Sequence, residues 1–253
     1  MSRIFPFTCG LLALAAALGA CCAPHGNHPG GAEAQEEGPG EEGGEEDAPI
    51  LAPGAAPLSG EKSLLAEARR ELGARRDTLY QHHIEVDEAK GSFRYDCSGF
   101  IDYALSRVAP DGLGQLRQKR PRAKDYVSFF ESIAPGPPVG RWRRVRQASE
   151  LQAGDLVVWL KPAELVSQNT GHMVLVAAPP QPGPRPGEVL LRVIDSSGGH
   201  GPEDARATGK TTGLGEGTVV LLLDESGVPR GYRWSTRAIS KAYATTIAMG
   251  RLE

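Results

Sequence analysis

The spacing of apolar residues changes near residue 150, from the period of a helix to that of a strand. Before this point apolar positions recur every three or four residues, which is typical of helices with one buried face. They predict helices over residues 61–76, over 97–108 and over 125–133. The buried positions expected on these helices are Leu64, Leu65, Ala68 and Leu72, then Phe100, Ile101, Ala104, Leu105 and Val108, and then Val127, Phe129 and Phe130.

After residue 150 the apolar runs become short or alternating, and Gly- and Pro-rich segments separate them, as is typical of strands. Strands are predicted over residues 155–160, 172–178, 189–195, 218–224 and 229–234. Residues 224–227 predict a hairpin turn between the last two. Helices followed by an antiparallel sheet indicate an α+β fold class, with N-terminal helices packed on a central sheet. Residues 61–253 are long enough for one domain with a sizeable core.

The first 20 residues have the features of a bacterial secretion signal. Arg3 supplies positive charge, and residues 11–18 form an apolar stretch shorter than the roughly 20 residues that span a membrane. The sequence Leu18-Gly19-Ala20-Cys21 resembles a lipobox, which implies cleavage before Cys21 and its acylation. We therefore expect a lipid anchor, on the periplasmic face of the outer membrane if the cell has two membranes. An ordinary signal peptide is the alternative.

Residues 21–60 consist mainly of Gly, Pro, Ala and Glu without apolar periodicity, so we expect an extended, disordered tether. Eight acidic residues lie between positions 33 and 47, and without them the net charge changes from −3 to +5. The positive charge gathers in residues 117–124 and 141–146. These basic clusters either attract an anionic polymer or form a solvated face. Nucleic acid is not an expected partner of an exported lipoprotein, and we expect a monomer.

Cys97 is the only one of the four cysteines inside the predicted domain. Exported domains normally use cysteines in pairs, so a single thiol suggests a chemical role. Asp96 is a suitable helix cap, which places Cys97 in the first turn. There the helix dipole and free N–H groups are expected to lower the pKa of the thiol and to bind an oxyanion. A buried structural cysteine is the alternative.

A catalytic thiol needs a base within hydrogen-bond distance and a third group that orients this base. His172 opens a predicted strand directly after Gly171, and Asp195 ends the next predicted strand. If these strands pair antiparallel, both side chains lie at the same end of the pair, where Asp195 would orient the His172 ring. His200 is the alternative third group. A structural strand-end histidine and a turn-forming aspartate are the simpler interpretations.

Three motifs in this order resemble the NlpC/P60 family of papain-like cysteine peptidases. They are Asp96-Cys97-Ser98-Gly99-Phe100, Leu151-Gln152-Ala153-Gly154-Asp155-Leu156-Val157 and Gly171-His172-Met173-Val174-Leu175-Val176. The resemblance implies a papain-like fold in which Cys97 is the nucleophile, His172 the general base and Asp195 the third polar residue. It implies substrate contacts by Asp96, by Ser98 and by an upstream tyrosine, for which Tyr80 is the candidate and Tyr95 competes. It implies no cofactor.

The same resemblance implies a hydrolase that cleaves amide bonds in the stem peptides of peptidoglycan. The chain departs from the family in residues 81–86, in a long insertion over 112–147, in a Pro-rich loop over 179–187 and in a tail over 208–253. Two alternatives therefore stay open. One is a wall-binding lipoprotein with weak or lost catalysis, and the other is an amidase or acyltransferase that acts on a different amide.

Other apparent motifs do not hold. Gly209-Lys210-Thr211 lacks the earlier glycine of a P-loop, because Asp204 stands in its place. The glycines at 213, 215 and 217 precede a predicted strand rather than a helix, which excludes a dinucleotide fingerprint. His82 and His83 have no partners at the spacing of zinc ligands, so no metal site is expected.

Overall fold

The computed structural model describes residues 63–204, 206 and 211–253. The predicted signal peptide over 1–20, the predicted tether over 21–60 and the expected lipidation residue Cys21 lie outside the described residues. None of the helices in the described part combines the length and the apolar character that crossing a bilayer requires.

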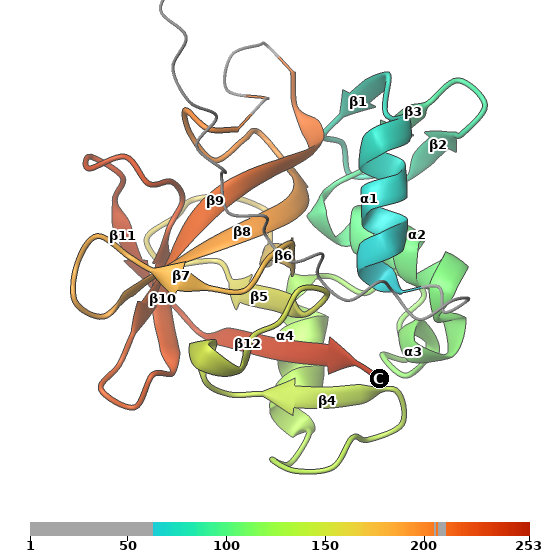
Figure 1. The fold of residues 1–253 in the computed structure, drawn as a ribbon. Coiled ribbons are helices and arrows are strands. Elements are labelled where there is room, and N and C mark those ends of the chain that lie inside the picture. Colours follow the sequence, from blue (N-terminus) through green and yellow to red (C-terminus); the bar gives the residue numbers. More distant parts are fainter. Residues whose placement is uncertain (1–62, 205, 207–210) are drawn as a thin grey trace, which may run out of the picture. The chain divides into compact units, whose positions relative to one another are not determined.

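A nine-stranded sheet organises the domain (Figure 1). Its order is β11-β10-β9-β8-β6-β5-β12-β4, with β7 paired to β8 outside this path, and all neighbours run antiparallel. The strands are β4 (Trp142–Val145), β5 (Leu156–Leu160), β6 (Gly171–Val176), β7 (Gln181–Pro182), β8 (Glu188–Ser197), β9 (Gly213–Leu223), β10 (Pro229–Arg233), β11 (Ala242–Ala244) and β12 (Ile247–Leu252). The predicted α+β class and its antiparallel sheet are confirmed.

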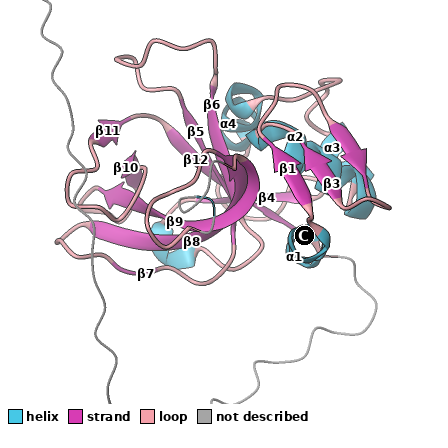
Figure 2. Cartoon of the chain, turned by 90° about the horizontal axis from the view of Figure 1, so that it is seen from above, coloured by secondary structure: helices cyan, strands magenta, loops and turns pink. Residues whose placement is uncertain are grey.

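The helices lie mainly on one side of this sheet, as Figure 2 shows from above. They are α1 (Leu64–Ala74), α2 (Cys97–Val108), α3 (Pro110–Gly114) and α4 (Ala123–Ser132), with a 3₁₀ turn η1 (Ala148–Glu150). Helix α2 packs against α1, β6 and β8, while α4 packs against β5 and β12. A second, small sheet of β1 (Asp77–Leu79), β3 (Ser92–Arg94) and β2 (Glu85–Asp87) leads into α2.

Helix α2 begins where the sequence predicts, because Asp96 caps it. The Asp96 side chain accepts the N–H of Gly99 at 2.7 Å, which satisfies one of the free donors of the first turn. The expected apolar face is buried, with Phe100 and Leu105 fully enclosed. The helix ends before Pro110, which starts α3. Local sequence alone therefore fixes the position of Cys97 at the start of α2.

Strand β6 separates two apolar cores because its side chains alternate between the faces of the sheet. Met173 and Leu175 belong to the core beneath the helices. Val174 and Val176 belong to the core on the other face. By the same alternation His172 shares the face of Val174 and Val176. Pairing between β6 and β8 is limited to Leu175 and Val176, so the edge of β6 near His172 is free to meet the start of α2.

Strand β12 is the main element that was not predicted from the sequence. Within the tail over 208–253, strands were predicted over 218–224 and 229–234 but none near the C-terminal end, where β12 pairs with both β5 and β4 inside the sheet. The predicted turn over residues 224–227 is confirmed, since the Gly227 N–H donates to the Asp224 carbonyl between β9 and β10. The tail is therefore part of the structural core.

Gly250 allows β12 to cross α4 at close range. A Cβ at this position would overlap the ring of Phe130, which is fully buried against Trp142. We expect Gly250→Ala to lower the free energy of unfolding by about 1–3 kcal/mol, the usual cost of overpacking a core. Gly73→Ala is the control, because Gly73 lies in α1 with open space around it and should gain about 0.5–1 kcal/mol. Urea unfolding measures both, and equal stability of the two variants would contradict this packing.

Candidate active site

Cys97 lies at the N-terminus of α2, at the free edge of β6. Its side chain is buried, with 5% of the residue exposed. The sulfur faces two backbone N–H groups, those of Ser98 and Met173. The Met173 N–H belongs to the peptide bond that joins Met173 to His172. The helix start and the strand start therefore meet at the sulfur.

The electrostatics of Cys97 overturn one expectation from the sequence. Burial raises the pKa of the thiol to about 12, and the negative charge of Asp96 contributes in the same direction. The two N–H groups oppose this shift but do not outweigh it. The sequence indicated the helix N-terminus correctly but not the depth of burial, which disfavours a thiolate. The resting sulfur is therefore a neutral thiol at neutral pH.

His172 and Asp195 make the contact that antiparallel pairing predicts. Nε2 of His172 lies 2.7 Å from Oδ2 of Asp195, and both residues are buried. Burial lowers the pKa of His172, although Asp195 partly opposes this, so the resting ring is neutral. Nδ1 has no hydrogen-bond partner among the described residues. That nitrogen is consequently the one available to accept a proton.

Asp195 is held as a carboxylate by a wider network. Oδ2 also contacts Nε2 of His200 at 2.9 Å, and Oδ1 accepts from the Arg206 guanidinium at 2.9 Å. Burial alone would raise the pKa of Asp195, but the charges of His200 and Arg206 outweigh it and hold that pKa well below its usual range. Arg206 was not identified from the sequence, because it lies in a polar loop without a recognisable pattern.

His200 touches Asp195 rather than His172, whose ring centre is 6.2 Å away. Nδ1 of His200 faces the carbonyl oxygen of Trp234 at 3.1 Å. Both ring nitrogens of His200 thus face oxygen acceptors. Of the two candidates for the third group, Asp195 contacts His172 directly, and His200 contacts Asp195.

The same cluster also has the composition of a metal site. His172, Asp195 and His200 offer possible ligand atoms that lie within 4.8 Å of one another. The two histidine contacts to Asp195 have hydrogen-bond lengths, however, and Arg206 already places a positive charge on the other oxygen. A cation would have to displace these donors next to a guanidinium. We therefore interpret the cluster as a hydrogen-bonded relay.

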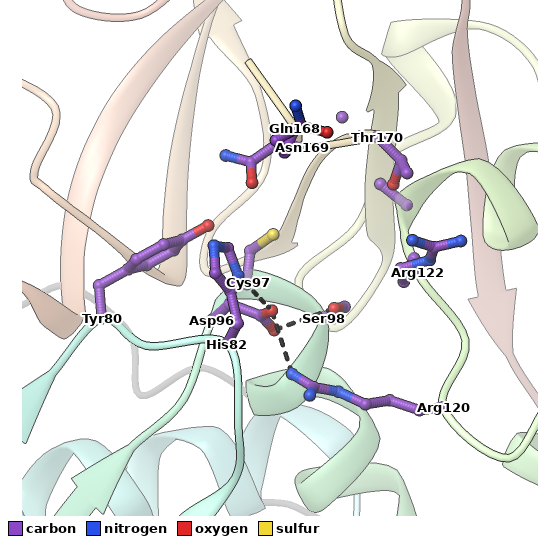
Figure 3. A pocket seen from close by; sticks show the side chains of 12 residues that line it. Tyr80, His82, Asp96, Cys97, Ser98, Arg120, Arg122, Gln168, Asn169 and Thr170 are labelled. Carbon is purple, nitrogen blue, oxygen red and sulfur yellow. Dashed lines mark hydrogen bonds and ion pairs between the residues drawn. The ribbon is translucent and has the colours of Figure 1, made fainter.

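A pocket of about 280 Å³ opens beside Cys97 (Figure 3). Tyr80 lines it, as expected, together with Asn169. Burial raises the pKa of Tyr80, with the nearby Cys97 as a second cause. The competing candidate, Tyr95, is fully buried and donates its hydroxyl to Glu71 at 2.6 Å. Tyr80 therefore faces the pocket, and Tyr95 is a core residue.

Asp96 and Ser98 also line the pocket, but their polar groups already bind each other and their neighbours. Oδ1 of Asp96 accepts the N–H of Gly99 and, at 2.9 Å, the hydroxyl of Ser98. Oδ2 contacts His82 at 3.2 Å and Arg120 at 3.1 Å. His82 and Arg120 were not expected at the site, because the chain brings them there from separate loops. A substrate group that binds Asp96 would have to compete with these contacts.

A second hollow of about 390 Å³ lies on the His172 side of Gly171. Gly171 and Asn169 line both hollows. The aromatic residues of the second one are Trp159, His172, Tyr232, Trp234 and Tyr243. The thiol and the imidazole thus lie between a polar pocket and an aromatic one, an arrangement that suits an extended chain crossing the site.

Comparisons with known protein families, with curated proteins and with solved structures find no match to this chain. The geometry alone defines the class of site. It is an α+β domain with a buried thiol at a helix N-terminus, next to a strand whose histidine is bonded to a buried carboxylate.

A neutral resting thiol has a measurable consequence. At about pH 7, iodoacetamide should alkylate Cys97 more slowly than it alkylates a free cysteine peptide, and the rate should still rise above about pH 9 as thiolate forms. Peptide mass spectrometry follows Cys97 separately from the other cysteines. A rate that is fast and constant from about pH 5 upward would instead indicate a preformed thiolate.

Proposed function

We propose that this protein is a cysteine hydrolase of peptide amide bonds. The observation that carries the proposal is the 2.7 Å contact between His172 Nε2 and Asp195 Oδ2, next to a sulfur that faces the peptide bond after His172. A nucleophile, a neutral base and an ionised orienting group are the parts that acyl transfer through a thiol requires.

The reaction begins with proton transfer from the Cys97 thiol to Nδ1 of His172 as the sulfur attacks the amide carbonyl. Asp195 stabilises the imidazolium that forms. The N–H of Cys97 itself has no partner among the described residues and is available for the oxyanion at the helix start. His172 then protonates the leaving amine, which leaves a thioester on Cys97. Water, deprotonated by His172, cleaves the thioester and releases a carboxylic acid.

The proposed substrates are the stem peptides of peptidoglycan, cleaved by a protein with a papain-like NlpC/P60 fold. Support comes from the three ordered motifs and from two hollows that meet at Gly171, where an extended peptide could lie on both sides of Cys97. The lipobox-like sequence ending in Cys21 supports export and a lipid anchor close to the wall. The placement at the outer membrane applies if the cell has two membranes.

One observation favours a second candidate, a wall-binding lipoprotein with weak or lost catalysis. The pKa of Cys97 is raised to about 12, which disfavours the thiolate that such chemistry uses. An amidase or acyltransferase acting on another amide would use the same groups. Product analysis separates these activities, because each leaves a different bond cut or formed.

Digestion of purified wall fragments, followed by mass spectrometry, tests the proposal. We expect new peptide termini with the unmodified protein, none with Cys97→Ala, and a rate about 10²–10⁴-fold lower with Asp195→Asn. Asp155→Asn is the matched control, since Asp155 is equally buried and paired with Arg251 but lies at the opposite end of β6 from His172. Thermal unfolding confirms that each variant is folded. Equal cleavage by the Cys97→Ala variant would refute the mechanism.

The lowered pKa of His172 sets the acid limit of activity. The base must be neutral, so kcat/KM should stay high at mildly acidic pH and fall only below the ordinary histidine value of about 6.5. Initial rates on a soluble stem peptide between about pH 4 and pH 8 measure this limb. An acid limb centred above about pH 7 would contradict a neutral buried imidazole.

A further inference from the structure

Two arginines reach the Cys97 pocket from the segment over 112–147, the insertion identified in the sequence. Arg120 and Arg122 lie just before α4 and line the pocket together with Ala123, the first residue of that helix. Figure 3 shows both arginines on the side of the pocket away from Tyr80, with Cys97 and Ser98 between. Part of the first basic cluster is therefore not a general solvated face but a wall of this pocket.

The charges in the pocket do not balance. Asp96 is the acidic residue that lines it, and Arg120 already pairs with that carboxylate at 3.1 Å. The guanidinium of Arg122 makes no hydrogen bond or ion pair with any residue in the described part of the chain. Nε of Arg120 is buried and likewise has no partner there. The pocket that Cys97 lines thus presents one uncompensated cation and spare N–H donors.

A carboxylate is the group that matches this surplus positive charge. A guanidinium offers parallel N–H donors that fit the two oxygens of a carboxylate. A single unpaired guanidinium balances a single negative charge. A phosphate dianion would bring a second charge toward Asp96, which repels it.

We propose that Arg122, assisted by Arg120, binds a carboxylate of the substrate peptide within one residue of the amide that Cys97 attacks. The site therefore selects peptides that carry a free carboxylate there over those in which it is amidated. This inference rests on the proposed hydrolase function and adds the substrate class. Arg120 also holds Asp96, so Arg122 is the residue whose replacement isolates the effect.

The test uses two soluble stem peptides that differ only in a carboxylate or a carboxamide beside the scissile bond. We expect the unmodified protein to prefer the carboxylate by about tenfold or more in kcat/KM, as a charged hydrogen bond provides. Arg122→Ala should abolish the preference by lowering kcat/KM for the carboxylate peptide to that of the carboxamide peptide, and Arg122→Glu should reverse the preference. Lys124→Ala is the control, because Lys124 is, like Arg122, an exposed cation of this segment but does not line the pocket.

Peptide binding to a variant that cannot cleave distinguishes carboxylate recognition from hydrolysis. Titration calorimetry of both peptides with Cys97→Ala, and with Cys97→Ala combined with Arg122→Ala, reports carboxylate recognition whether or not hydrolysis occurs. Tighter binding of the carboxylate peptide, lost with Arg122, supports the inference even if no peptide is cleaved. Equal affinity for the two peptides, or a preference unchanged by Arg122→Ala, overturns it while leaving the hydrolase proposal open.

Discussion

A carboxylate without contact to water, that of Asp195, is the group on which the site depends. Removing an isolated charge from water costs several kcal/mol, and a protein retains it only with donors on both oxygens. His172 and His200 donate to one oxygen, and Arg206 donates to the other. The same guanidinium binds the Asp195 and Gly213 carbonyl oxygens, on neighbouring strands β8 and β9. The network that orients His172 therefore also joins β8 to β9 at this corner of the sheet.

This network also explains a glycine pattern in β9 that superficially resembles a dinucleotide motif. A side chain at Gly215 would overlap the Arg206 guanidinium. One at Gly217 would overlap the Asp204 carboxylate and His200. The glycines leave space for the polar cluster on that face of β9, where alternate positions point the same way. They leave room for His200 and Arg206, which donate to Asp195.

The features that could be predicted from the sequence depend on local patterns or on one strand pairing. Asp96 caps α2 because its side chain reaches an N–H three residues away, and His172 meets Asp195 because antiparallel strands align their ends. Strand β12 could not be predicted, since its partners β5 and β4 lie far away in sequence and it contains a glycine. Arg206 reaches the site from a loop with no periodicity. Such features depend on contacts between residues far apart in the sequence, and no short sequence pattern indicates these contacts.

The low pKa expected for the Cys97 thiol is wrong for the same reason, because three-dimensional packing decides how deeply the thiol is buried. Asp96 stabilises the start of α2, but its negative charge also raises the pKa of the adjacent thiol. Arg120 pairs with this carboxylate at 3.1 Å. The segment over 112–147 thus contributes charge as well as shape to the pocket beside Cys97. In the proposed reaction the thiol and His172 are both neutral at rest, so charge separates only when a proton moves between them. Asp195, already ionised, is the group that makes this separation favourable inside the protein.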